Sequence, residues 1–429
     1  MKLFLHAGSA LRQVEVMKRW TIGRVIMRLK LQFGYGMMEH TRSLIGAWGG
    51  GDVVLSPRDL SAEQLQRLAA DVLNLGGGGV LIDPQFYLPH ADHERLVAHD
   101  YWPKDYESAG FWGPEQVSTL LTKLAALNAD LKTSAFILPG LLAGRVDEDW
   151  LARQQMLIDE ADRLGITGNR LATIALSGEA VAVDDDVHEL LDHVGDWKVD
   201  GFYVVVEHPK ADYLVSDPTW LTNVLDLCAG LKLKGRRVVV GYCNHQMLCL
   251  GAAAVDALCS GTWMNVRSFP QDKFRMQLDD EIKQRATWYY APTALSEYKI
   301  PFLDTAKRQG VLDLLSAPAG LGSKHADVLF SGVQPTTVGF TEQAAFRHYL
   351  QCMHMQVAAV VKPTFEETCA GLERQLDDAE KVLGRVRALG VTGALRDFHE
   401  CVDANRAALA VLKSQRGTIL ARKWSTLIA

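Results

Sequence analysis

The sequence lacks an apolar run long enough to cross a membrane, and the apolar stretch within MKLFLHAGSALRQ at its start is too short for a secretory signal peptide. Its seven cysteines include no CxxC pair and no close metal-ligand spacing. These absences argue against a membrane span, a zinc module and a disulfide framework. We therefore expect a reduced, cytoplasmic protein.

The sequence also lacks internal repeats, low-complexity tracts and an excess of positive charge, since its 429 residues carry a formal net charge of −6. Nothing in that balance attracts nucleic acid or an anionic membrane in general. An early basic segment, which includes Arg12, Arg19 and Arg28, is either a phosphate-facing arm or a solvated face. With 48% hydrophobic and 22% charged residues, the chain is long enough for a sizeable core.

What is present is an alternation of short apolar runs with amphipathic helical stretches. The eight runs are Leu3–Leu5, Val53–Leu55, Val80–Ile82, Ala135–Leu138, Leu171–Leu176, Phe202–Val206, Val238–Val240 and Val255–Leu258. Such alternation predicts a parallel sheet, and eight units predict a closed (β/α)8 barrel with its site at the carboxyl ends of the strands. We expect the barrel over residues 1–310 and a helical region packed on it over 311–429.

Local signals place several elements within this plan. Ser61 with Gln64 predicts a capping box, and Pro114 predicts the first turn of another helix. Two long connections, residues 8–52 and 85–113, are expected to be functional loops. Past about Arg267 the alternation stops, and the remainder is predicted to be helical, with long helices from about Glu342 to Leu412.

Asp83 is the first candidate site residue, because it directly follows an aliphatic strand and Pro84 ends the regular ladder behind it. A carboxylate at the barrel mouth accepts N–H donors from a heterocycle or acts as a general acid or base. The alternative is a helix cap or a structural partner of an arginine.

Glu179 follows ALSG at the fifth strand, and Glu207 follows the sixth. Two carboxylates in one pocket would raise one pKa and divide their roles. Each is alternatively neutralised in a structural network.

The last two strands add Asn244, His245, Cys259 and Arg267. His245 is a candidate base, phosphate ligand or helix-start residue, and Arg267 a candidate phosphate ligand. Cys259 is either a nucleophile activated by a neighbouring cation or a buried inert thiol. We expect no metal, since His90 and His93 have no third ligand nearby, and no His-x-His signature accompanies His6.

In this order the strand-end motifs resemble the tRNA-guanine transglycosylase family, whose barrel exchanges guanine for a 7-deazaguanine. VLIDPQFY stands where the family has Asp-Ser-Gly-Gly-Phe-Gln, so the resemblance makes Asp83 the aspartate near the base and assigns Gln85 and Phe86 to base binding. ALSGE stands where a family Gln-Gly-Gly binds the base, which assigns Ser177 and Gly178. The run over residues 236–269 is similar to the family's last two strands.

This chain departs from the family in three places, one of which is the altered Gly-Gly phosphate and base platform. The nucleophilic aspartate falls near Cys259 or Ser260, with Asp256 at an earlier non-catalytic aspartate, and WYYAPTALSEYKIPFLD has none of the zinc-site cysteines. The resemblance therefore implies a barrel for a purine-like or deazapurine base without a metal or other cofactor. Divergent members of the group in bacterial defence systems suggest a defence role by analogy.

Two hypotheses lead, with an unrelated barrel hydrolase or lyase as a third. One is an enzyme with Asp83 as acid/base, Glu207 and Glu179 as second carboxylates, and substrate positioned by Asn244, His245 and Arg267, with Phe86, Tyr87 and Trp263 stacking on the base. The other is a degenerate barrel that binds a modified base, nucleic acid or a partner protein. The C-terminal helices either cover the barrel or mediate a homodimer.

Overall fold

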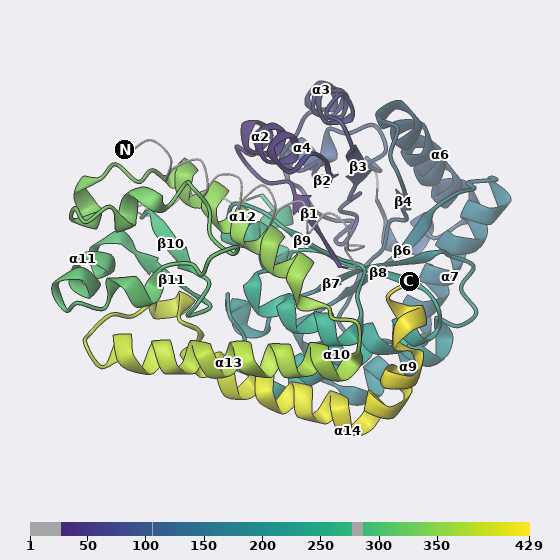
Figure 1. Cartoon of the computed structure of the whole chain (residues 1–429). Coiled ribbons are helices and arrows are strands. Elements are labelled where there is room, and N and C mark those ends of the chain that lie inside the picture. The colour runs from purple at the N-terminus through teal and green to yellow at the C-terminus, as the bar shows by residue number, and fades with distance from the viewer. Residues whose placement is uncertain (1–26, 105, 277–285) are drawn as a thin grey trace.

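A curled parallel sheet lies at the centre of the protein, whose computed structural model describes residues 27–104, 106–276 and 286–429 (Figure 1). Its strands are β1 Arg28–Gln32, β2 Gly51–Leu55, β3 Gly78–Ile82, β4 Phe136–Ile137, β5 Leu142–Ala143, β6 Arg170–Leu176, β7 Gly201–Val206, β8 Arg237–Val240 and β9 Ala257–Ser260. They pair in the order β3-β2-β1-β9-β8-β7-β6-β4, with β5 beside β6, and all pairs are parallel.

The two ends of this path, β3 and β4, meet at a seam. No ladder pairs these two strands in the residues that the structure describes, and the Ser134 amide donates to the Val80 carbonyl at 2.8 Å across the gap. The structure thus confirms the predicted α/β class and the parallel sheet, which is curled through eight strand positions. It does not show ladder closure of a full (β/α)8 barrel.

Helices follow the first six strand positions, as the sequence predicts. They are α2 Met38–Trp48, α3 Ala62–Leu73, α4 Glu94–Val97, α5 Ser108–Phe111, α6 Pro114–Leu131, α7 Glu148–Arg163, α8 Gly178–Val181, α9 Asp184–His193 and α10 Pro218–Leu233. The capping box is confirmed, because Gln64 N donates to Ser61 Oγ and Ser61 N donates to Gln64 Oε1. Pro114 is confirmed as the first residue of α6.

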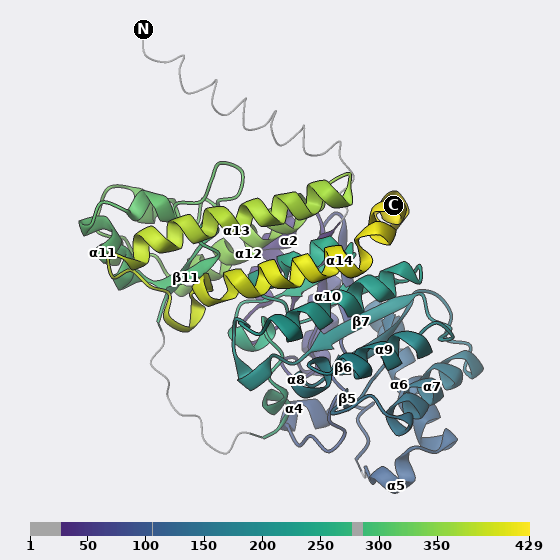
Figure 2. The same ribbon diagram turned by 90° about the horizontal axis from the view of Figure 1, so that it is seen from below.

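The last two strand positions are covered differently. After β8 comes a fully buried 3-10 helix, η2 His245–Ala253. The C-terminal helices are α11 Ile300–Arg308, α12 Glu342–Val360, α13 Phe365–Arg387 and α14 Cys401–Leu427. η2 contacts α10, α12, α13 and α14. Figure 2 shows α14 lying between α10 and α13, so α14 packs against the helix that follows β7.

Two predictions about elements are wrong, and a third falls outside the described residues. The expected loop over residues 8–52 contains β1 and α2, because RLKLQ places Lys30 and Gln32 among its leucines and so hides a central strand. The region past Arg267 contains the hairpin of β10 Trp288–Ala291 and β11 Ser296–Lys299 rather than helices alone. The predicted first strand, Leu3–Leu5, lies outside the described residues.

Candidate functional site

Asp83 lies at the carboxyl end of β3, where the strand stops. Its amide donates to the Leu55 carbonyl of neighbouring β2 at 3.1 Å, which is the last ladder contact before Pro84. The side chain is 1% exposed. A buried carboxylate must be hydrogen-bonded or protonated, so its partners decide what it can do.

Tyrosine hydroxyls surround this carboxylate. Tyr242, just past β8, donates at 2.7 Å, and Tyr87 lies 2.9 Å from both carboxylate oxygens. Tyr203 on β7 lies at 3.4 Å, and the Gln85 amide donates at 2.9 Å. Residues from three separate strand positions therefore converge on one buried acid. We call Asp83 with these three tyrosines the Asp83 centre.

Burial raises the pKa of Asp83, although the hydrogen bonds from Tyr242, Tyr87 and the Gln85 amide act in the opposite direction. Burial also raises the pKa of each tyrosine, so the hydroxyls stay protonated and donate. A carboxyl with a raised pKa among permanent donors is suited to taking up and returning a proton.

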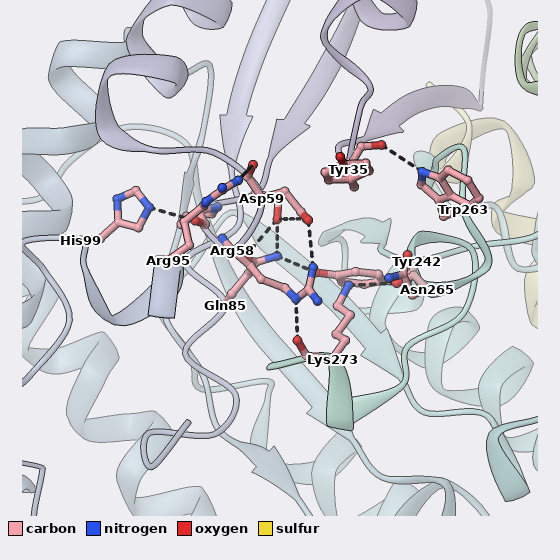
Figure 3. Close-up of polar contacts among 12 residues, drawn as sticks. Tyr35, Arg58, Asp59, Gln85, Arg95, His99, Tyr242, Trp263, Asn265 and Lys273 are labelled. Atoms are coloured by element: carbon pink, nitrogen blue, oxygen red, sulfur yellow. Dashed lines mark hydrogen bonds and ion pairs between the residues drawn. The ribbon is translucent and has the colours of Figure 1, made fainter. Parts of the chain in front are cut away.

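Gln85 connects this centre to the end of β2. Its amide nitrogen donates to Ser56 Oγ at 2.9 Å and to Tyr242 Oη at 3.1 Å, while its oxygen accepts from the Arg58 amide at 2.9 Å. Ser56 in turn donates to Asp59 at 2.7 Å, and Asp59 pairs with Arg58 at 2.8 Å. Figure 3 shows this cluster of polar contacts.

Two of the eight side-chain-bearing residues that have a positive φ in the described part of the chain lie at this place. Gln85 and Tyr242 both have φ of 55°, a left-handed conformation that costs side-chain-bearing residues free energy, and their side chains are hydrogen-bonded to each other. Strain of this kind persists only where the surroundings enforce it, and it is concentrated at functional sites.

A covering segment, defined here as residues 261–276, closes the Asp83 centre from outside. Phe269 packs edge-on against Tyr87 and Tyr242, and Phe274 lies 5.2 Å from the Tyr87 ring. Lys273 places its Nζ 3.8 Å from the centre of the Tyr242 ring and donates to the Asn265 carbonyl at 2.9 Å (Figure 3). Burial lowers the pKa of Lys273 to about 7.

The other predicted carboxylates lie away from Asp83. Glu207 follows β7 and accepts hydrogen bonds from Gln271 of the covering segment at 3.0 Å and from the Gly178 amide at 3.3 Å. Glu179 is exposed on α8. Ser177 caps α8 by accepting from the Ala180 amide. Among the described contacts, none joins Glu207 or Glu179 to Asp83.

Two predicted aromatic contacts have protein partners. Phe86 turns into a cluster with Trp102, 5.2 Å away, and with Phe111. Trp263 donates to the Tyr35 carbonyl at 2.9 Å and packs on Phe346. Figure 3 shows Trp263 directed toward Tyr35, apart from the Gln85 cluster.

Cys259 lies on β9 with a fully buried thiol. Burial raises its pKa to about 12, so the thiol is protonated near neutral pH and is a poor nucleophile in this state.

Arg267, His245 and Asn244 belong to a second buried cluster, between the sheet and the C-terminal region. Arg267 pairs with Glu297 of β11 at 3.2 Å, and Arg396 pairs with the same carboxylate at 2.7 Å. We call these three residues the Glu297 clasp. Asn244 caps η2 by accepting from the Gln246 amide. His245 lies beside the clasp among aromatic rings, and burial lowers its pKa to about 4.

The sequence signals did not identify Tyr203, Tyr242 or Lys273 as site residues. Tyr203 lies within the apolar run FYVVVE, where a tyrosine is indistinguishable from a core residue, and Lys273 follows the last predicted strand. Of the three, Tyr242 came nearest to the positional signal of Asp83, since it lies two residues past the end of a predicted strand.

Comparison with known proteins identifies no relative: no family model matches the chain, and neither does any curated protein. Across the described part of the chain, no group of three or more acidic, histidine or cysteine side chains is arranged to hold a metal ion. None of its helices there combines the length and apolar character that a membrane crossing requires.

Proposed function

We propose that this chain is a transglycosylase-like enzyme that binds a purine or 7-deazaguanine-type base at the Asp83 centre. The observation that carries the proposal is the buried Asp83 carboxyl, which stands at a strand end among hydroxyl donors and has a raised pKa. A guanine-type base presents adjacent N–H donors along one edge, and these match the two acceptor oxygens of a carboxylate.

The surroundings of Asp83 support the same ligand class. Phe269, Phe274 and Tyr87 supply aromatic faces, on which flat heterocycles stack. Gln85 supplies a side-chain amide whose nitrogen donates to Ser56 and whose oxygen accepts from the Arg58 amide. We further propose that the curled sheet is a (β/α)8 barrel whose seam between β3 and β4 is bridged through Ser134 and Val80.

A second function, base binding without covalent chemistry, is favoured by one observation. The position that the family resemblance gives to the nucleophile holds Cys259, whose thiol has a pKa of about 12. A barrel with no nucleophile would recognise a modified base, alone or within nucleic acid, without exchanging it.

Calorimetric titration with guanine, 7-deazaguanine and adenine tests the proposal. We expect saturable binding of guanine or 7-deazaguanine by the native protein and at least a tenfold loss in Asp83→Asn, with thermal stability nearly unchanged. Asp71→Asn is the matched control, because Asp71 is half-exposed in an ion pair with Arg42 on the outer surface. Absence of binding by folded native protein, or equal binding by Asp83→Asn, would overturn the proposal.

A further inference from the structure

Lys273 is a buried lysine with no carboxylate in hydrogen-bond or ion-pair contact in the described part of the chain, although the charges of Asp59 and Asp83 act on it from a longer range. It is 3% exposed, and its Nζ donates to the Asn265 carbonyl and lies 3.8 and 4.9 Å from the ring centres of Tyr242 and Phe274. Buried ammonium groups are ordinarily paired, so an unpaired one is under pressure to become a neutral amine. A neutral amine is a nucleophile.

Lys232 provides the contrast within the same chain. It is 5% exposed, nearly as buried as Lys273, but its Nζ lies 2.9 Å from both oxygens of Asp256. Lys232 thus has a carboxylate in direct contact, which Lys273 does not have among the described contacts. The different environment of Lys273 therefore reflects its site rather than burial alone.

Lys273 and Asp83 both contact the side chain of Tyr242. Asp83 approaches from β3, whereas Lys273 approaches from the covering segment, and Tyr242 contacts both, with its hydroxyl on Asp83 and its ring under the amine. A base held by Asp83 at depth would direct its attached sugar outward, toward the covering segment and the amine.

We propose that the Lys273 amine is the nucleophile of this site and attacks the anomeric carbon of a nucleoside whose base is held by Asp83. This inference rests on the proposed function and supplies the group that Cys259 does not. The new bond joins Nζ to C1′, and the bond from C1′ to the base nitrogen breaks.

The protons balance within the Asp83 centre. Protonated Asp83 gives its proton to the departing base, and the resulting carboxylate takes one proton from the alkylated ammonium. The sugar ring then opens: the bond from C1′ to the ring oxygen breaks, the nitrogen proton moves to that oxygen, and Nζ and C1′ form an imine. After the ring closes again, an incoming base attacks C1′, and the bond from C1′ to Lys273 Nζ breaks. No oxidant, reductant or metal enters this exchange.

Reductive trapping tests the step. The native protein is incubated with a guanine-containing RNA or DNA oligonucleotide and cyanoborohydride, and the digest is analysed by mass spectrometry. We expect a covalent adduct on Lys273, none on Lys232, and loss of the adduct in Lys273→Arg while guanine binding stays within about threefold of native. Native protein that binds guanine but forms no adduct with either oligonucleotide, or forms it elsewhere, overturns the nucleophile and leaves base binding intact. Failure to bind guanine would instead overturn the proposed function.

A second measurement does not depend on the oligonucleotide. With formaldehyde and cyanoborohydride at pH 7, we expect Lys273 to be methylated more than tenfold faster than Lys232 in the same sample. Equal rates at the two buried lysines would show that the Lys273 amine is not activated, and would overturn the proposal.

Discussion

At the scale of single residues, the Asp83 centre joins an acid that burial makes weaker to donors that burial keeps protonated. Tyr242 is the key neighbour because it gives Asp83 its shortest hydrogen bond, at 2.7 Å, and also underlies the Lys273 amine. A hydrogen bond to the ionised form lowers the pKa of an acid. Loss of the Tyr242 hydroxyl should therefore raise the pKa of Asp83.

We expect Tyr242→Phe to raise the pKa of Asp83 further and to weaken guanine binding about tenfold, which corresponds to about 1.4 kcal/mol for one charge-assisted hydrogen bond. The pH dependence of binding should shift to higher pH. Tyr289→Phe is the control, since the Tyr289 hydroxyl is also buried and donates to the Leu315 carbonyl at 2.8 Å, outside the centre. An unchanged pH profile in Tyr242→Phe would contradict this account.

The sequence predicted part of this site for a clear reason. Asp83 is an acidic residue directly after an aliphatic run. In parallel sheets, ligands bind beyond the carboxyl ends of the strands, where such a residue lies. Tyr203 and Lys273 were not predictable, because the value of each depends on long-range neighbours such as Gln32, which lies 171 positions before Tyr203. Phe86 lies in the same motif as Asp83 and was predicted to stack on the base, but its ring packs on Trp102 within the 85–113 segment.

At the scale of elements, the Glu297 clasp holds three segments together. Arg267 belongs to the covering segment, Glu297 to β11, and Arg396 to the 3-10 helix Ala394–Arg396 before α14. The two arginines lower the pKa of Glu297 to about 2 even though burial alone would raise it. A carboxylate that serves two buried cations is costly to remove.

We therefore expect Glu297→Gln to reduce the free energy of unfolding by about 3 kcal/mol or more, because two buried guanidinium groups lose their counterion. Urea denaturation measures the change. Glu380→Gln, which breaks an exposed pair with Arg406, should leave stability nearly unchanged. Equal effects of the two substitutions would show that the clasp is dispensable.

Prediction at this scale succeeded where the sequence pattern was local. The capping box of α3 and the start of α6 depend on neighbouring residues and are confirmed. β1 escaped prediction because its polar side chains have partners from other elements: Lys30 pairs with Asp52, and the Gln32 oxygen accepts a hydrogen bond from Tyr203.

At the scale of the whole molecule, buried histidines link stability to pH. Burial lowers the pKa of His208, His245 and His348 from 6.5 to about 4, so the native state keeps them neutral while an unfolded chain protonates them below about 6.5. Their contribution is fully present above pH 6.5 and is lost as the pH falls toward 4. His354, whose pKa burial also lowers to about 4, acts in the same direction, whereas Asp83, with its raised pKa, opposes this trend.

Between pH 6 and 5 we expect the free energy of unfolding to fall by roughly 3 kcal/mol, since each proton contributes about 1.4 kcal/mol per pH unit. Chemical denaturation at several pH values measures the slope. His245→Phe should reduce the slope by about one proton, because both ring nitrogens of His245 are buried without a hydrogen-bond partner in the described residues. A slope near zero in the native protein would refute the linkage.

The seam between β3 and β4 has one more consequence. Asp83 directly follows β3, which pairs with a neighbouring strand on one side only in the described residues. Its carboxylate accepts hydrogen bonds from Tyr203 of β7 and from Tyr242 just past β8. Those hydrogen bonds connect strands on two sides of the curled sheet near the seam, where no ladder joins β3 to β4 in the described residues. A ligand that binds Asp83 while the tyrosine hydroxyls keep their hydrogen bonds adds a further tie near this seam, so that occupancy of the site and rigidity of the curled sheet rise and fall together.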